Sequence, residues 1–245
     1  MTYEPRLYRR VVDPAGLTCF EVVVAETDLA ICAVEDLSDV AEDLAIRARW
    51  DVENYIVRHP RFAESYVPVQ VEPDAPAIVQ QMARAAWRAN VGPMASVAGA
   101  IAEYVARGLA EKTPDVIVEN GGDVYLIGGH ERVVALWANQ PGVDRIGLRI
   151  PAGMQPVAVC TSSGTIGHSD SLGSADAVTA LAHDGALADA VVTALANRVH
   201  GAEDIDKAIA AAQNVPGVFG VLVTIGGHVG AWGSVRLTPL ERPVQ

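Results

Sequence analysis

Small side chains dominate the segment Met94–Ala110, which reads MASVAGAIAEYVARGLA. The segment predicts a helix, and its Ala and Gly faces would let that helix lie very close to a sheet or to another helix. Glu103, Arg107 and Glu111 interrupt the small residues, which argues against a membrane-spanning helix. Half of the chain is hydrophobic, mainly through Ala and Val, so we expect a core built from small side chains and close backbone approach.

The order of the expected helices and strands indicates the fold class. Helices are expected at about Ser38–Arg58, Ala77–Ala89, Met94–Ala110, Ala186–Val199 and Asp204–Gln213. Strands are expected within Leu7–Ala33 and at Val116–Val118, Val124–Ile127, Val133–Ala138, Ile146–Ile150, Val157–Cys160, Val218–Ile225 and Val229–Leu237. Without a regular βαβ alternation, this order favours an α+β fold with mixed or antiparallel sheets. No linker divides the chain, so residues 1–245 are expected to form a single domain.

Charge and hydropathy limit the partners. A formal net charge of -12 argues against nucleic acid or an anionic membrane surface, since phosphate binding needs clustered Lys and Arg. No apolar run approaches the ~20 residues that span a bilayer, and Met1–Arg10 contains no apolar signal core. We therefore expect a soluble, cytoplasmic protein with no membrane partner.

The chain has three cysteines, Cys19, Cys32 and Cys160. Their number is odd and their spacing does not match a zinc site. We therefore expect reduced thiols and no disulfide framework.

Polar and potentially ligating residues are densest in Thr161–Asn197. The segment opens with a polar turn directly after an apolar strand, and this turn consists of Thr161, Ser162, Ser163 and Gly164. His168 follows in the same loop. Asp189 and Thr193 would lie one turn apart on one face of a helix, where they form either a cation site or a capped surface turn.

A glycine turn stands between two expected strands and reads Glu119, Asn120, Gly121, Gly122 and Asp123. Such a turn can simply close a hairpin. Its backbone N–H groups can also remain free to bind an anion or a flat ring. A second polar turn contains Thr27 and Asp28, which can cap the turn or reach a ligand.

Four stretches in order resemble the ApbE-like superfamily, the FAD:protein FMN transferases. They are GPMASVAGAIAE (Gly92–Glu103), ENGGDV (Glu119–Val124), TSSGTIGHSD (Thr161–Asp170) and ADAVVT (Ala188–Thr193). The chain is more similar to an uncharacterised branch of that superfamily, from Glu26–Leu29 through ADAVVTALAN, which is nearly the whole length.

The resemblance implies two intimately associated lobes around a cleft that binds FAD. It also implies that Mg²⁺ on the pyrophosphate assists transfer of FMN to a Ser or Thr of a target protein, with release of AMP. By position, Asp189 and Thr193 match the metal ligands, and the turn Asn120–Asp123 matches the nucleotide turn. Thr161, Ser162 and Gly164 resemble a T-S-G loop in which Ser163 is an extra residue, and His168 resembles the residue with a base or orienting role.

Two departures from the superfamily pattern leave other functions open. Ala95–Ile101 stands where the transferases carry A-K-G-x-x-x-D, without its lysine and aspartate, and Asp170–Gly173 replaces D-P-x-T-G. The alternatives are a related enzyme that acts on a different nucleotide or small metabolite, and a non-catalytic flavin or nucleotide binder. A homodimer is the default expectation for a soluble enzyme of this kind.

Overall fold

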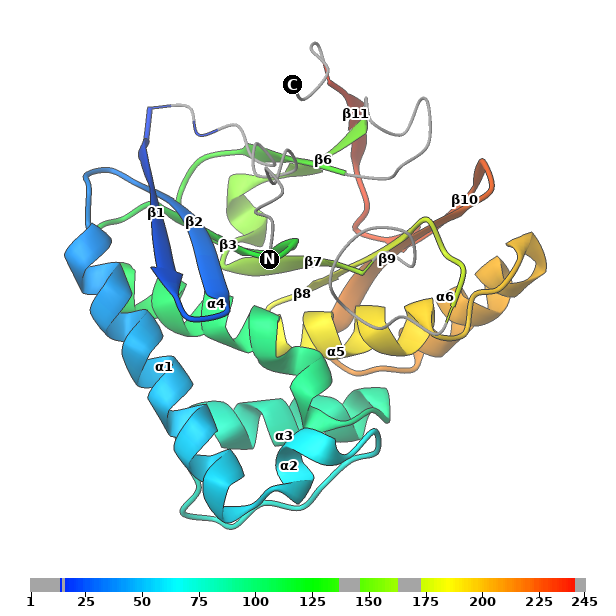
Figure 1. Cartoon of the computed structure of the whole chain (residues 1–245). Helices are drawn as coiled ribbons and strands as arrows, with labels where there is room; N and C mark the ends of the chain where they lie inside the picture. Colours follow the sequence, from blue (N-terminus) through cyan, green and yellow to red (C-terminus); the bar gives the residue numbers. More distant parts are fainter. Residues whose placement is uncertain (1–13, 15, 137–145, 163–172, 241–245) are drawn as a thin grey trace, which may run out of the picture.

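The computed structural model describes residues 14, 16–136, 146–162 and 173–240. These residues form three layers, in which a large sheet lies between a layer of helices and a small sheet (Figure 1).

The large sheet has eight strands in the order β1-β2-β3-β4-β7-β8-β9-β10, and the small sheet has the order β11-β6-β5. All neighbouring strands are antiparallel. The strands of the large sheet are β1 (Thr18–Val24), β2 (Thr27–Ala33), β3 (Val116–Asn120), β4 (Asp123–Ile127), β7 (Val157–Ser162), β8 (Ala177–Ala182), β9 (Val218–Ile225) and β10 (His228–Gly233). Those of the small sheet are β5 (Arg132–Ala135), β6 (Ile146–Ile150) and β11 (Leu237–Pro239). The expected α+β class with antiparallel sheets is confirmed.

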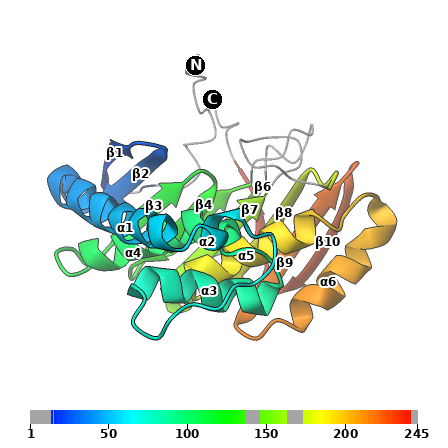
Figure 2. The same cartoon turned by 60° about the horizontal axis from the view of Figure 1, so that its bottom comes forward.

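The helices occupy one face of the large sheet (Figure 2). They are α1 (Ser38–Arg58), α2 (Arg61–Glu64), α3 (Ala77–Ala89), α4 (Val97–Leu109), α5 (Gly185–Ala196) and α6 (Ile205–Gln213). The described residues also contain the 3-10 turns η2 (Pro93–Ser96), η3 (Ala152–Met154) and η4 (Ala202–Asp204). The small-residue helix expected from Met94 thus begins as a 3-10 turn, because Pro93 stands at its start, and becomes α-helical at Val97.

The last expected strand is divided between the two sheets. β10 ends at Gly233, whose φ of +77° lies in the left-handed region, and Leu237 pairs in the small sheet instead. A chain that changes sheets here brings its C-terminal part back over the large sheet.

Central strands of the large sheet are buried on both faces. Val116 and Val118 of β3 belong to the core shared with the helices, whereas Ile117 between them packs with Leu148 and Ile150 toward the small sheet. Successive side chains of a strand point to opposite faces. Burial on both faces explains the continuous apolar run Val116–Val118 at the start of β3.

Two helices at the centre of the helical layer come into backbone contact. α4 packs on β3 and β4, and α5 packs on β7 and β8. A Cβ atom on Gly99 of α4 would overlap the carbonyl oxygen of Gly185 in α5 and would lie 2.8 Å from the Cβ of Asp189. The expected close approach of the small-residue helix therefore occurs at the Gly99–Gly185 crossing.

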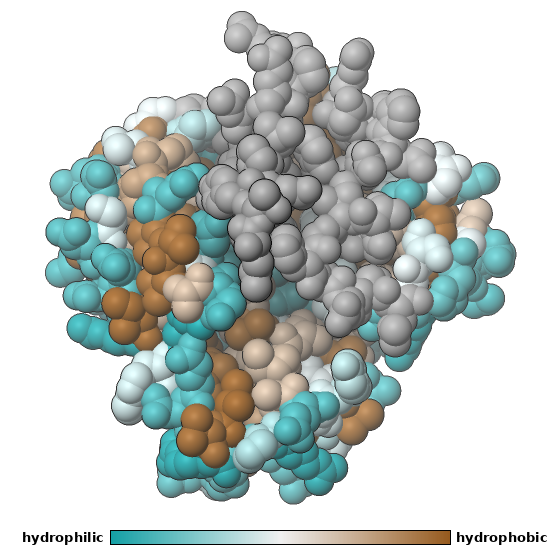
Figure 3. All heavy atoms as spheres, viewed as in Figure 1, coloured by the Kyte–Doolittle hydropathy of each residue, from teal (hydrophilic) through white to brown (hydrophobic). Residues whose placement is uncertain are grey.

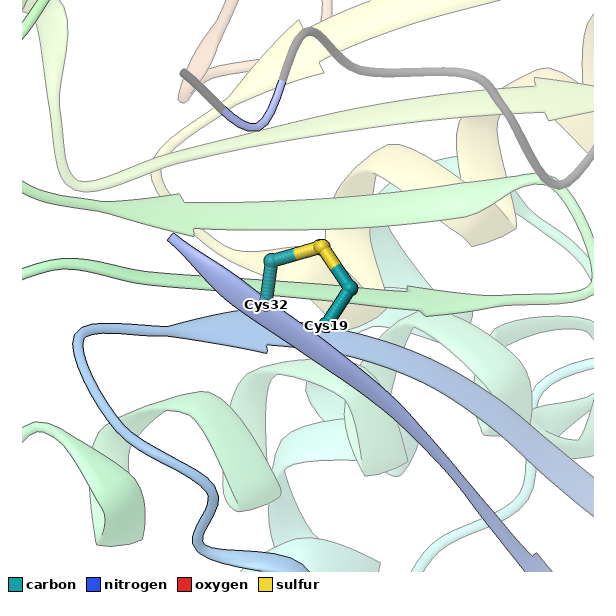
Figure 4. The surroundings of a disulfide bond; sticks show 2 residues. All are labelled: Cys19 and Cys32. Carbon is teal, nitrogen blue, oxygen red and sulfur yellow. A yellow bond between two sulfur atoms is a disulfide. The ribbon is translucent and has the colours of Figure 1, made fainter. Parts of the chain in front are cut away.

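A disulfide joins β1 and β2, so the expectation of three reduced thiols is wrong for two of them. The antiparallel register places Cys19 directly opposite Cys32, and their sulfur atoms are bonded (Figure 4). Sequence spacing does not show this pairing because it depends on where the hairpin turns. Cys160 is a free and buried thiol, as expected.

Some large apolar side chains stay exposed on the outer face of α1. Trp50 and Val57 are 63 % and 79 % exposed, and Ile46 lies on the same face. Figure 3 shows hydrophobic residues gathered over this side of the molecule. In the described part of the chain, no helix is long and apolar enough to cross a membrane.

We expect Gly99→Ala to destabilise the fold by ~2 kcal/mol or more, because its Cβ would meet backbone atoms that have little freedom to shift. Urea unfolding followed by circular dichroism measures the loss. Gly153→Ala is the matched control, since a Cβ there would meet nothing within 4 Å. Equal midpoints for the two variants would contradict the backbone contact.

Candidate functional site

The glycine turn between β3 and β4 is held in one conformation. Gly121 and Gly122 have φ values of +67° and +107°, which favour glycine. The amide of Asn120 donates to the carbonyl of Ala98 at 3.0 Å, and the Gly122 N–H donates to Oε1 of Glu119 at 2.7 Å. The turn is therefore tied to the start of α4.

Asp189 lies on α5 beside the Gly99–Gly185 crossing. Its side chain is buried, and Oδ2 accepts the Gly99 N–H at 2.9 Å. Gly185 precedes Asp189 by one helical turn, so both residues present the same face to α4. One carboxylate oxygen of Asp189 is thus fixed by the N-terminal turn of α4.

Asp123 is the first residue of β4 and directly follows the glycine turn. Val124 pairs with Val159, so Asp123 lies beside Cys160 at the end of β7. The residue is only 6 % exposed, and its Oδ1 has no hydrogen-bond partner among the described residues. A buried carboxylate oxygen without a partner marks a place where a cation or an unseen donor belongs.

Burial dominates the electrostatics of the two aspartates. It raises the pKa of Asp189 to about 7, although backbone N–H groups of Gly99 and Ala98 oppose the shift. Burial also raises the pKa of Asp123, and the negative charge of Asp189 raises it further. Neither carboxylate forms an ion pair with a Lys, Arg or His in the described part of the chain. Among the residues that the structure describes, the two groups thus form an acidic site without a basic side chain to neutralise it.

The oxygen donors near this acidic site fit a hard cation. Thr193 follows Asp189 by one turn of α5 and is half-buried. Among the described residues, no three His, Cys, Asp or Glu side chains converge on one metal position. Mg²⁺ commonly takes few protein ligands and completes its shell with water and phosphate, so Asp189, Asp123 and Thr193 suit that ion.

Part of the predicted site lies outside the described residues. Ser163, Gly164 and His168 fall there, so the structure does not place them. Thr161 and Ser162 end β7, and the Thr161 hydroxyl lies 3.0 Å from that of Thr179 on the neighbouring strand. A Cβ on Gly122 would lie 3.4 Å from the Thr161 carbonyl, so this strand end adjoins the glycine turn.

Thr27 and Asp28, in the second polar turn, have different surroundings. Thr27 accepts a hydrogen bond from Arg49 at 2.8 Å, which is structural. Asp28 is buried next to Leu29, which pairs with Asn120 at the glycine turn. Asp28 therefore lies at the edge of the sheet that carries the candidate site.

Sequence reasoning missed Gly99, Gly185 and Glu103 as parts of the site. Glu103 is buried, and its Oε2 accepts the Gly185 N–H at 2.6 Å. The available signal was an isolated glycine inside a helical pattern, because such a glycine often marks close backbone approach.

The fold matches solved structures of flavin transferases. The flavin transferase ApbE from Vibrio cholerae aligns with a TM-score of 0.57 at 13 % identity, covering 89 % of this chain and 97 % of that one. The ApbE protein from Thermotoga maritima aligns with a TM-score of 0.55 at 14 % identity, covering 92 % and 97 %. The architecture is that of an ApbE-like protein.

Sequence similarity places the chain within this class. The family model described as AbpE bacteria matches residues 9–226, and the chain belongs to that family. A UPF0280 protein of Methanococcus aeolicus is 39 % identical over 222 residues, covering 88 % of this chain and 90 % of the relative. A UPF0280 protein of Methanocaldococcus jannaschii is 40 % identical over 222 residues, covering 87 % and 90 %. The chain is thus a member of the UPF0280 branch of the ApbE-like superfamily, as its motifs predicted.

The raised pKa of Asp189 predicts how stability depends on pH in chelator-treated protein. Between about pH 4, where an unfolded Asp ionises, and the folded pKa of about 7, the native state holds the extra proton. Stability should therefore fall as pH rises through this window, and Asp189→Asn should remove part of that fall. Denaturant unfolding at several pH values, with EDTA, measures the difference. Parallel pH profiles for the two proteins would contradict the buried, proton-binding carboxylate.

Proposed function

We propose that the protein binds FAD with a divalent cation and transfers FMN to a Ser or Thr hydroxyl of a target protein. The proposal rests chiefly on one observation, the buried pair Asp123 and Asp189 beside the glycine turn, with no basic partner in the described part of the chain. The resemblance to flavin transferases in fold and motif order supports it.

The absence of a basic partner argues for a cation with the nucleotide. A pyrophosphate brought to two ionised, buried carboxylates would be repelled unless a positive charge lay between them, and a cation also favours the ionised form of both groups. At the crossing of α4 and α5, the Gly99 N–H already donates to Asp189 and the Gly185 N–H to Glu103, so these two donors are not available to a phosphate. We infer that the phosphates are held through Mg²⁺ on Asp189, Asp123 and Thr193.

Bound Mg²⁺ would draw negative charge from the phosphate oxygens and ease cleavage of the pyrophosphate. The chain would supply the rest of the site. The glycine turn Asn120–Asp123, with Thr161, Ser162, Ser163 and Gly164, would hold the nucleotide. Asp189 would stay oriented by the Gly99 N–H while its second oxygen binds the cation.

In the transfer step, the target hydroxyl oxygen forms a bond to the phosphorus of the FMN half of FAD. The bond from that phosphorus to the bridging oxygen breaks, and AMP leaves with the bridging oxygen. The hydroxyl proton passes to a base, and His168 is our candidate because a neutral imidazole accepts a proton near pH 7. No group is oxidised or reduced.

The central helix departs from the pattern of the transferases. Over Ala95–Ile101, where the sequence aligns with this pattern, its lysine and its aspartate are both missing. The missing lysine favours a second candidate, a related protein that acts on a different nucleotide or small metabolite, or one that binds flavin without turnover.

We expect FAD affinity to depend on Mg²⁺. Removing the ion with EDTA should weaken FAD binding by ~10-fold or more, since the ion that links the aspartates to the pyrophosphate would be lost. Fluorescence titration of FAD, with and without Mg²⁺, measures the effect. Asp189→Asn should abolish the response to Mg²⁺.

Asp115→Asn is the matched control for that titration. Asp115 is also buried and accepts a backbone N–H, from Gly129 at 3.2 Å, but it precedes β3 at the end away from the glycine turn. The control should keep the response to Mg²⁺. FAD binding that is equally tight with EDTA would contradict the cation site, and no FAD binding under any condition would favour a different nucleotide.

We expect AMP release when FAD, Mg²⁺ and a target protein are mixed, with a loss of ~100-fold or more in Asp189→Ala because the cation would no longer be held. Chromatography of the nucleotides gives the rate. Tight Mg²⁺-dependent FAD binding without AMP release, across flavoprotein candidates, would support the non-catalytic binder instead.

The homodimer stays a prediction. Ile46, Trp50 and Val57 on the outer face of α1 offer exposed apolar surface for such an assembly. Sedimentation velocity of the purified chain measures its mass in solution.

A further inference from the structure

Glu103 is a charged residue in the helical layer with partners from several elements. It is 5 % exposed. Its Oε2 accepts the Gly185 N–H at 2.6 Å and the Gln81 amide at 2.7 Å. Its Oε1 accepts from Arg107 at 2.6 Å and from the Tyr125 hydroxyl at 3.3 Å. A buried carboxylate with this many donors is fixed in one orientation.

Glu103 and Asp189 form a reciprocal pair across the crossing of α4 and α5. Glu103 on α4 accepts the N–H of Gly185, the first residue of α5. Asp189 on α5 accepts the N–H of Gly99, in the first turn of α4. Each helix therefore provides the carboxylate that satisfies the N-terminal turn of the other.

Close packing at the crossing couples the Glu103–Gly185 and Asp189–Gly99 hydrogen bonds. A Cβ on Gly185 would lie 3.1 Å from the Cβ of Glu103, and one on Gly99 would lie 2.8 Å from the Cβ of Asp189. Gly185 and Asp189 are one turn apart on a single helix. A shift of Gly185 relative to α4 must therefore move Asp189 as well.

We propose that Glu103 is a positioning residue for Asp189, one that sets where the second oxygen of Asp189 lies for the cation. This inference rests on the proposed function, because it concerns the position of the proposed metal ligand Asp189. Glu103 acts through the backbone of α5 and does not touch the cation.

Hydrogen bonds to neighbouring side chains fix the carboxylate of Glu103 in this position. Arg107 pairs with Glu103 and also donates to the Tyr125 hydroxyl at 2.8 Å. The single proton of that hydroxyl is shared between Glu103 Oε1 and the His183 carbonyl oxygen, which lies 3.0 Å away. Gln81 joins Glu103 to Asp184, which caps α5 by accepting the Leu187 N–H at 3.0 Å. The network links α3, α4, β4 and the start of α5.

Glu103→Gln tests the proposal with little change of shape. The amide has one oxygen, so either the Gly185 and Gln81 donors or the Arg107 and Tyr125 donors must face an NH₂ group. Tyr125→Phe is the matched control, because it removes hydrogen bonds of the same network and leaves the Gly185 N–H bond in place.

Two readouts are measured at a temperature where all variants are folded: amide hydrogen exchange at Gly99, and Mn²⁺ affinity by calorimetry. Glu103→Gln should speed Gly99 exchange and weaken Mn²⁺ binding, each by ~10-fold or more, while Tyr125→Phe should change both by less than ~3-fold. A general loss of stability would speed exchange of all core amides alike and would leave Mn²⁺ affinity unchanged, so exchange at Gly99 is compared with exchange at other core amides of the same variant.

Equal Gly99 exchange in Glu103→Gln and Tyr125→Phe would overturn the proposal. Faster Gly99 exchange only in Glu103→Gln, in a protein that binds no Mn²⁺ even as wild type, would uphold the positioning of Asp189 and refute the proposed cation site. If Glu103→Gln does not fold, Gln81→Leu replaces it, since it removes one of the two donors to Oε2 and should move Gly99 exchange in the same direction.

Discussion

The backbone contact between α4 and α5 at Gly99 and Gly185 is the constraint on which the rest of the site depends. It brings the N-terminal turn of each helix beside a carboxylate of the other, so Asp189 and Glu103 satisfy backbone donors that would otherwise be buried and unpaired. The glycine turn joins this arrangement through Asn120 and the carbonyl of Ala98. A larger residue at either glycine would separate all of these groups at once.

The electrostatics of the site follow from the same packing. Asp123 and Asp189 are buried because β4, β7 and the two helices close around them, and burial raises the pKa of both. Helix N-termini commonly bind phosphate, but here the Gly99 and Gly185 N–H groups already hold carboxylates. This is one reason why we propose that a nucleotide is bound here through a cation. The buried thiol of Cys160 beside Asp123 also has a raised pKa caused by burial, so it is a poor nucleophile and a packing residue.

Much of the fold could be predicted from the sequence, since α3 and β9 follow directly from periodicity and turn residues. The roles predicted for Asp189, Thr193 and the glycine turn rest on the superfamily resemblance, because a Gly-Gly turn or an Asp four residues before a Thr is common in structural roles. The Cys19–Cys32 disulfide could not be predicted, because it depends on the register of the β1–β2 hairpin, which the sequence alone does not fix. The Glu103–Gly185 hydrogen bond could not be predicted either, because it depends on how two helices far apart in the sequence cross.

Anomalous diffraction from crystals of the protein grown with Mn²⁺ and FAD is the most direct test of the central claim, that the α4–α5 crossing builds a cation site for a nucleotide. We predict an anomalous peak bonded to the oxygen of Asp189 that does not accept the Gly99 N–H, with the FAD phosphates on its other side. Bound FAD with its phosphates away from Asp189, and no anomalous peak between Asp189 and Asp123, would contradict the account.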